Sequence, residues 1–420
     1  MNYVIVGNSA AGIGGIEGIR MIDKKSNITV ISDEKYHTYS RPLISYYLAN
    51  KVSLDDMKYR KDDFYKENNV QTFFGEKVVS VNKDDKVVEL ISGKQIDFDK
   101  LLLATGANPF IPPITGSDKE GIETFINLDD AKDIGQKIEN EEIKEVVILG
   151  AGLIGLKAAE ALLKLGIKVK VVELADRILS AILDKKSAQI VQSYLEDKGI
   201  SFILEDTIKE FLGDSKVEGA ILESGTELEC GLAVIAVGVR ANTDIVEGTD
   251  IKLNRGIIVD NNLESNIEGI YAAGDVSEGY DLVQDKSSVI PIWPNAYHQG
   301  LVAGQNMAGV EKSYQQGFAR NSIGFFNLDM ITAGVIEAQD DDCEVLTTTF
   351  LEDTSYRKII LKNNRIIGFI LLNQIDRAGI LTGLIKEQKD VSKFKDELLK
   401  PDFGYLSFDK DERESLIKGD

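Results

Sequence analysis

Cysteine and histidine are scarce in this sequence. Cys230 and Cys343 are the only thiols among 420 residues, and His37 and His298 are the only imidazoles. These counts exclude a disulfide framework, a four-cysteine zinc site, a cysteine-ligated iron-sulfur cluster and a histidine-rich metal site. We therefore predict no metal site. We also expect a cytoplasmic location, because disulfides are rare in that reducing compartment.

Positive charge and long apolar segments are also in short supply. Lys and Arg number 48 against 69 Asp and Glu, which gives a formal net charge of −21. Phosphate backbones and anionic lipid repel such a polyanion, so we expect neither nucleic acid nor a membrane as a partner. No apolar run reaches about 18 residues and no charged leader precedes the first apolar strand, so we expect no transmembrane helix and no signal peptide.

Two copies of one pattern stand out against this background. Each copy has a short apolar strand, a glycine-rich turn, a helix and a second strand. The first copy comprises a strand at 3–6, a turn at 7–12, a helix to about 21 and a strand at 28–31; the second comprises a strand at 146–149, a turn at 150–155, a helix to about 165 and a strand at 169–172. The sequence thus predicts two βαβ units in a chain long enough for two or three domains.

The second turn has every residue type that a dinucleotide's pyrophosphate requires. Gly150 makes the tight turn, Gly152 lets the backbone approach the phosphates, and Gly155 lets the helix pack closely on the strand. Glu173 follows about 20 residues on, where an acid accepts a hydrogen bond from a ribose 2′-hydroxyl. We predict a nucleotide site here, and the alternative is a turn that only serves packing.

The first turn is less regular. Gly7 and Gly12 hold the outer positions, but Ser9 replaces the middle glycine. A hydroxymethyl group is small enough to be accommodated, so we predict a second dinucleotide site. Asp33 is the expected ribose acid, with Glu34 as the competing candidate.

The repetition extends beyond the glycine turns, and the pattern of expected elements changes towards the C-terminus. Hairpin turns at 92–93 and 224–225 are each followed by an apolar strand, at 101–106 and 232–238, which indicates a duplicated architecture. From about 321 the sequence alternates strand-like runs with one helix near 379–387, as in a small α+β domain. The charged segment 393–420 is predicted to be a surface extension of unknown role.

Two further motifs complete a family resemblance. Ala104-Thr105-Gly106 and Tyr271-Ala272-Ala273-Gly274-Asp275, together with the two glycine turns, resemble the two-dinucleotide flavoproteins of the pyridine-nucleotide-disulfide reductase family over roughly 2–388. The resemblance implies an α/β fold with two Rossmann-like domains, an FAD domain interrupted by an NADH domain, and a small C-terminal α+β domain. The implied boundaries are 1–110 and 241–320 for FAD, 111–240 for NADH, 321–392 for the C-terminal domain and 393–420 for the extension.

The resemblance also implies site residues. Asp275 would hydrogen-bond the ribityl chain of FAD, Arg41 would lie near the flavin and the pyrophosphate, and the segment 293–297 would begin a helix that points at the flavin. The residues so assigned to FAD are Gly7, Ser9, Gly12, Asp33, Glu34, Arg41, Pro42, Thr105, Gly106, Gly274, Asp275, Trp293, Asn295 and Ala296. Those assigned to NADH are Gly150, Gly152, Leu153, Ile154, Gly155, Glu173 and Gly238.

Two departures from the family pattern bear on mechanism. Disulfide reductases carry a reactive cysteine after the first ribose acid, but here no cysteine precedes Cys230, so we expect no thiol relay. Lys157 stands where the family usually has a glutamate beside the nicotinamide, with Glu160 one turn on as a candidate substitute; an exposed helix lysine is the alternative. His298 is a candidate proton donor, although an ordinary helix histidine is the favoured interpretation.

The segment 39–45 resembles the branch that contains NADH:rubredoxin reductases and the flavin domain of assimilatory nitrite reductases. We therefore expect electrons to pass from NADH through FAD to a small iron-sulfur carrier such as rubredoxin or a ferredoxin-like protein. The basic cluster 58–61 is the candidate docking patch, and an ordinary solvated face is the alternative. The alternatives are an NADH oxidase or peroxidase and a redox-sensing protein that resembles apoptosis-inducing factor. The sequence leaves the acceptor and the oligomeric state open, a homodimer included.

Overall fold

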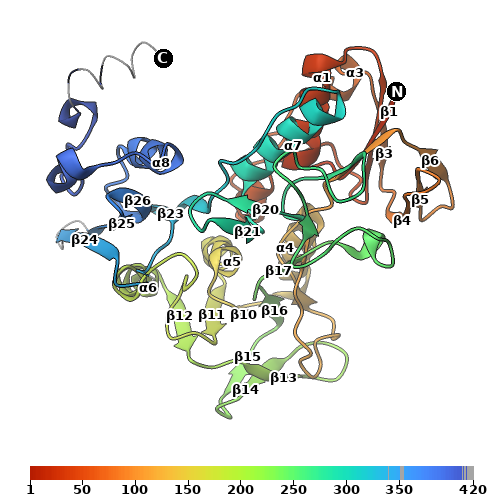
Figure 1. The fold of residues 1–420 in the computed structure, drawn as a ribbon. Coiled ribbons are helices and arrows are strands. Elements are labelled where there is room, and N and C mark those ends of the chain that lie inside the picture. Colours follow the sequence, from red (N-terminus) through yellow and green to blue (C-terminus); the bar gives the residue numbers. More distant parts are fainter. Residues whose placement is uncertain (339, 351–353, 409, 411–412, 414–420) are drawn as a thin grey trace.

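The first parallel sheet joins two distant parts of the chain. The computed structural model describes residues 1–338, 340–350, 354–408, 410 and 413 (Figure 1). Five strands lie in the order β19-β7-β1-β2-β3. They span Asn2–Val6 (β1), Asn27–Ser32 (β2), Val70–Phe74 (β3), Lys100–Leu103 (β7) and Ile270–Ala272 (β19). The last strand returns to the sheet after a second sheet has formed, so the two outer segments of the chain build one Rossmann-like layer.

The second parallel sheet is built from the intervening residues. Its order is β12-β11-β10-β16-β9. These strands span Ile122–Glu123 (β9), Glu145–Leu149 (β10), Lys168–Glu173 (β11), Ile200–Leu204 (β12) and Leu232–Ile235 (β16). The central strands of both sheets are continuous β-branched and leucine runs that are buried on both faces, as expected for parallel sheets covered by helices.

The helices of the two Rossmann-like domains are α1 (Ala10–Ile22), α2 (Ile44–Leu48), α3 (Phe64–Glu67), α4 (Leu128–Glu141), α5 (Leu153–Lys164), α6 (Lys185–Asp197) and α7 (Trp293–Met307). A further helix, α8 (Ala378–Lys386), belongs to the C-terminal domain. Figure 1 shows α7 lying along α1. Glycines make this contact close: a Cβ on Gly18 would overlap the backbone of Leu301, and one on Gly304 would overlap that of Gly15. No helix in the described part of the chain is long and apolar enough to cross a membrane.

Smaller sheets accompany both parallel sheets. The antiparallel ones are β4 (Val78–Asn82) with β5 (Val87–Leu90) and β6 (Gln95–Asp97); β13 (Ile208–Leu212) with β14 (Gly219–Leu222) and β15 (Glu227–Glu229); and β8 (Ala107–Pro109) with β17 (Val239–Ala241). A mixed sheet pairs β20 (Ser277–Asp281) in parallel with β18 (Ile257–Ile258) and antiparallel with β21 (Lys286–Ser288). The first two sheets occupy the same place in each copy of the repeat, and β8 with β17 forms the crossing between the two copies.

The C-terminal domain is an antiparallel sheet with one longer helix. Its order is β22-β23-β26-β25-β24, and the strands span Arg320–Phe325 (β22), Leu328–Gly334 (β23), Cys343–Phe350 (β24), Ser355–Lys362 (β25) and Arg365–Leu372 (β26). The sequence predicts a surface extension at 393–420, but the structure differs from this prediction. The described residues of this segment up to 408 complete the C-terminal domain. Phe394, Leu398, Phe403 and Phe408 are buried in one core with α8, β25 and β26. Short 3₁₀ turns place them there, so the sequence shows no periodic apolar pattern.

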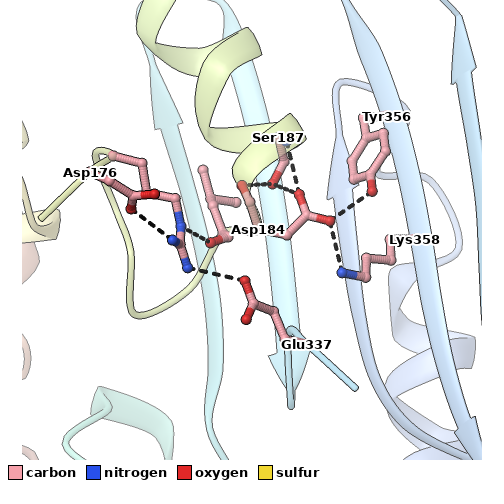
Figure 2. A network of polar contacts seen from close by, with 8 residues as sticks. Asp176, Asp184, Ser187, Glu337, Tyr356 and Lys358 are labelled. Atoms are coloured by element: carbon pink, nitrogen blue, oxygen red, sulfur yellow. Dashed lines mark hydrogen bonds and ion pairs between the residues drawn. The ribbon is translucent and has the colours of Figure 1, made fainter. Parts of the chain in front are cut away.

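A buried ion pair fixes the C-terminal domain to the second parallel sheet's domain. The carboxylate of Asp184, the residue before α6, accepts hydrogen bonds from Lys358 Nζ and Tyr356 Oη on β25, each at 2.8 Å (Figure 2). It also caps α6 by accepting from the backbone N–H of Ser187 at 2.9 Å. Burial alone would raise the pKa of Asp184, but these donors hold it below its usual value. The carboxylate therefore stays ionised at neutral pH.

We expect Asp184→Asn to destabilise the protein by about 3 kcal/mol, because Lys358 would remain buried without a counter-charge. Urea unfolding at pH 7 measures this loss. Asp62→Asn is the matched control, since it breaks an exposed pair with Lys58 and should cost less than about 1 kcal/mol. Equal losses in the two variants would contradict the assignment of Asp184 as an anchor.

Candidate functional site

One large cavity connects the two glycine turns. Its volume is about 1270 Å³. Its wall includes residues of both Rossmann-like domains and residues 322–324, which lie on β22 of the C-terminal domain. Single-ligand pockets are commonly about 300–1,000 Å³, so this cavity has room for a dinucleotide and part of a second ligand. The predicted residues that line it are Gly7, Ser9, Asp33, Glu34, Arg41, Pro42, Thr105, Gly106, Gly150, Gly152, Leu153, Ile154, Lys157, Glu173, Gly238, Gly274, Asp275, Trp293 and Ala296.

Three predicted site residues lie behind this wall rather than in it. A Cβ on Gly12 would overlap the carbonyl oxygen of Gly7, and one on Gly155 would overlap that of Gly150. These glycines therefore serve the close packing of helix on strand. Asn295 is buried and accepts a hydrogen bond from Tyr314 Oη at 2.5 Å, so it holds the first turn of α7 in place.

The first glycine of each turn is required by the backbone itself. Gly7 has φ +118° and Gly150 has φ +109°, which side chains rarely adopt. In each case a Cβ would also overlap the chain that leaves the neighbouring strand, at Ala104 and at Ala236. The turn thus presses against a second strand end in both domains, at the place where Rossmann-like sheets bind ligands.

The middle position of each turn differs from the first, because neither its backbone angle nor its surroundings require glycine. Gly152 has φ −78°, and a Cβ there would meet no atom within 4 Å. Ser9 occupies the corresponding position with φ −100°, an ordinary value for any residue. The fold therefore does not need glycine at this position, and the approach of a ligand's phosphates is the remaining reason for a small residue.

The helices that follow the two turns begin without a capping side chain. In the described residues, neither α1 nor α5 has a side-chain cap or an acidic residue in its first turn. By contrast, α4 has a capping box of Asn127 and Asp130, and α6 is capped by Asp184. The first N–H groups of α1 and α5 are thus available to an anion, as a pyrophosphate site requires.

The structure separates the two candidate ribose acids of the first copy. Glu34 accepts a hydrogen bond from Tyr39 Oη at 2.5 Å and forms an ion pair with Arg41. Arg41 in turn donates to the carbonyl oxygen of Ile126 at 3.1 Å. Glu34 is therefore engaged in joining the two Rossmann-like domains, and Asp33 is the better candidate for the ribose.

Asp275 lies in the cavity wall, and a residue missed by the sequence analysis holds its turn. Gln299 on α7 accepts from Gly274 N at 2.8 Å and from Ser277 Oγ at 3.2 Å. Burial raises the pKa of Asp275 to about 6, and Arg41 opposes this shift. A hydroxyl donor such as a ribityl chain would satisfy the carboxylate. Only the tertiary contact between α7 and this turn identifies Gln299.

Glu173 in the second copy faces its own glycine turn. One carboxylate oxygen accepts from Ala151 N at 2.7 Å, and the other accepts from Ala175 N at 2.8 Å. Each oxygen keeps a second lone pair for a ribose hydroxyl. The backbone contacts fix the carboxylate at the mouth of the predicted NADH site.

Of the two residues expected near the nicotinamide, Lys157 lines the cavity and Glu160 does not. Lys157 lines the cavity with its side chain 15% exposed, so it is not an exposed helix lysine. It pairs with Glu160 and donates to Gly324 O at 3.2 Å in the C-terminal domain. Glu160 lies outside the cavity wall, pairs also with Lys164 and accepts from Phe326 N at 2.9 Å. It therefore joins α5 to the C-terminal domain.

The two cysteines and the candidate proton donor His298 lie apart from the cavity. Cys230 is buried in a hydrophobic core, which raises the pKa of its thiol to about 11, and Cys343 lies on β24. His298 is not among the cavity residues; burial and nearby Arg320 and Lys386 lower its pKa.

The basic cluster 58–61 is largely neutralised by neighbouring carboxylates. Lys58 pairs with Asp55 at 2.8 Å and with Asp62 at 2.7 Å, and Arg60 pairs with Glu17 at 2.7 Å. These pairs favour the alternative of an ordinary solvated face over a free positive docking patch, since the acids come from the flanking turns and from α1.

Buried polar atoms in the cavity wall test whether a flavin dinucleotide fits. Thr38 Oγ1, Ser45 Oγ and His37 Nε2 line the cavity and have no hydrogen-bond partner within the described part of the chain. Buried polar atoms are normally paired. Together with the uncapped start of α1, these atoms fit a large polar ligand such as FAD. No group of three or more metal-ligating side chains is placed to hold a metal in the residues described.

Gly152→Ala and Gly155→Ala should separate binding from packing. We expect Gly152→Ala to leave Tm unchanged and to weaken NADH binding by about tenfold or more, because the new methyl group would occupy the space of the phosphates. Gly155→Ala should instead destabilise the fold by about 1–3 kcal/mol. Thermal unfolding and NADH titration measure both effects. Unchanged NADH affinity in Gly152→Ala would rule out this turn as the phosphate site.

Asp275→Asn should have opposite effects on the apoprotein and on FAD binding. Because the folded pKa is about 6 and the unfolded value is about 3.9, the contribution of this group to stability is present below about pH 4 and lost as the pH rises through 6. The variant's apoprotein should therefore be more stable than the native one at pH 8 and equal to it at pH 4. FAD should bind about tenfold more weakly, because a charge-assisted hydrogen bond is lost. Full FAD retention on dialysis would exclude the contact.

Comparison with known proteins agrees with this geometry. Residues 1–300 match the pyridine nucleotide-disulphide oxidoreductase family, and residues 321–389 match the rubredoxin NAD+ reductase C-terminal domain. The chain is 32% identical over 392 residues to a nitrite reductase (NAD(P)H) of Bacillus subtilis, covering 93% of this chain but only 48% of that protein. It thus spans about half the length of that relative.

Other relatives match over most of their length. The chain is 30% identical to a rubredoxin-NAD(+) reductase of Ectopseudomonas oleovorans, covering 92% of this chain and 99% of that one. It is 34% identical to an NADH oxidase of Methanocaldococcus jannaschii, covering 75% and 71%. The crystal structure of NADH:rubredoxin oxidoreductase from Clostridium acetobutylicum superimposes with a TM-score of 0.76 at 27% identity, over 95% of this chain and 98% of that one. The resemblance seen in the sequence is confirmed: this chain belongs to the pyridine nucleotide-disulphide oxidoreductase family.

Proposed function

We propose that this protein transfers electrons from NADH through FAD to a small iron-sulfur protein, without a redox-active cysteine. The observation that carries the proposal is the single cavity whose wall contains both glycine turns and neither of the two cysteines. FAD, when bound, accepts a hydride and can release its electrons one at a time, which suits a one-electron acceptor. The relatives named for rubredoxin support this class of acceptor.

The chain's own residues would bind and orient the two dinucleotides. The N–H groups at the starts of α1 and α5 would hold the pyrophosphates, and Asp33 and Glu173 would accept from the riboses. The start of α7, at Trp293 and Ala296, contributes a partial positive charge to the cavity wall. Lys157, which is paired with Glu160, places an ammonium group in the wall at the junction with the C-terminal domain.

Stopped-flow spectroscopy of the FAD-loaded protein tests the proposal. Flavin bleaching by NADH under anaerobic conditions reports the first half-reaction, and reduction of added rubredoxin or ferredoxin reports the second. We expect both steps at catalytic rates. A protein that is reduced by NADH but reduces neither carrier would contradict the proposal.

An NADH oxidase is the second candidate, favoured by the identity to the Methanocaldococcus protein. Rapid oxygen consumption with water or peroxide as product, at a rate above that of carrier reduction, would support it. The cytoplasmic location and the homodimer remain predictions.

Replacing both cysteines by serine, Cys230→Ser with Cys343→Ser, should leave NADH-to-carrier turnover within about threefold of the native value, since neither thiol lines the cavity. Flavin content is measured alongside turnover. A collapse of turnover at normal flavin content would reveal a thiol relay.

A further inference from the structure

We propose that Glu337 of the C-terminal domain is a positioning residue for coenzyme choice: it holds Arg177 away from the cavity and so keeps the second dinucleotide site selective for NADH over NADPH. The inference rests on the proposed use of NADH, but not on the identity of the electron acceptor. It concerns the loop between β11 and α6, residues 174–184, which follows the ribose acid Glu173.

Only some residues of the loop line the cavity. Leu174, Leu179 and Ser180 do so, next to Glu173, whereas Arg177 in the middle of the loop does not. An arginine near the ribose is the usual means of accommodating the 2′-phosphate of NADP. The chain therefore has the required side chain in the required loop, but pointing elsewhere.

Three acceptors account for the direction of Arg177. Its guanidinium donates to Glu337 Oε1 at 3.1 Å, to Asp176 Oδ1 at 2.9 Å and to Leu183 O at 3.4 Å (Figure 2). The side chain is only 21% exposed. Asp176 and Leu183 belong to the loop itself, so Glu337 is the acceptor that draws Arg177 towards the C-terminal domain.

The position of Glu337 relative to the loop is fixed by the buried anchor. Asp184, at the end of the loop, binds Tyr356 and Lys358 on β25, and Figure 2 shows this cluster beside Glu337. The side chains of Lys358 and Asp184 are 9% and 11% exposed. Because the loop end is tied to the same domain that carries Glu337, the pair forms without ordering a flexible segment.

This arrangement leaves a 2′-phosphate next to the negative charge of Glu173. Arg177, the cation of the loop that could offset this charge, is engaged by Asp176 and Glu337. Removing the Glu337 charge should let Arg177 turn towards the ribose part of the time. Exposed ion pairs contribute little and Asp176 retains Arg177 in part, so we expect a gain of about three- to fivefold in preference for the 2′-phosphate.

Binding of adenosine phosphates to the FAD-loaded protein tests the proposal without any acceptor. Adenosine 2′,5′-bisphosphate is the probe, and adenosine 5′-monophosphate is the reference that lacks the 2′ group. We expect Glu337→Gln to bind the bisphosphate about three- to fivefold more tightly while its affinity for the monophosphate is unchanged. The ratio of kcat/KM for NADPH to that for NADH should rise by the same factor, and added salt should reduce the gain.

Two controls make the result specific. Glu344→Gln removes the same charge from an ion pair with Lys395 in the same domain, and it should not change the affinity ratio. In the double variant Arg177→Ala with Glu337→Gln the gain should vanish. An unchanged ratio in Glu337→Gln, or an equal rise in the double variant, would overturn the proposal. Failure of carrier reduction alone would bear only on the proposed function.

Discussion

The close approach of backbone to backbone at the glycine turns is the constraint on which the rest of the structure depends. Gly7 and Gly150 press on the strand ends at Ala104 and Ala236, where a single Cβ would overlap main-chain atoms. This contact brings the helix start, the first strand and its neighbour to one point at the carboxyl edge of each sheet. The cavity exists because two such edges face each other, and both helix starts that open on it are uncapped.

The C-terminal domain closes this arrangement rather than standing apart from it. Lys157 on α5, the helix after the second glycine turn, donates a hydrogen bond to Gly324 on β22. Asp184, at the end of the loop between β11 and α6, accepts one from Lys358 on β25. The segment after residue 392 adds four buried apolar side chains, Phe394, Leu398, Phe403 and Phe408, to the core of this domain.

Electrostatics within the cavity depend on which charges are already paired. Glu34 and Arg41 neutralise each other at the boundary of the two Rossmann-like domains, and Glu160 is shared by Lys157 and Lys164. Within the described residues Asp275 forms no such ion pair, and burial raises its pKa to about 6. The proposed ribityl acid therefore differs from Glu34 and Glu160, whose charges are used in contacts between domains.

The sequence by itself determined the two βαβ units and their glycine turns, and it predicted the ribose acids, because these features are local in spacing and composition. Only the tertiary structure separated Asp33 from Glu34, placed Glu160 outside the cavity, identified Gln299 and turned Arg177 towards Glu337. Each of these outcomes is set by a partner many residues away or by competition between neighbouring acids. Spacing along the chain carries no record of such pairings, since they arise when separate layers pack together.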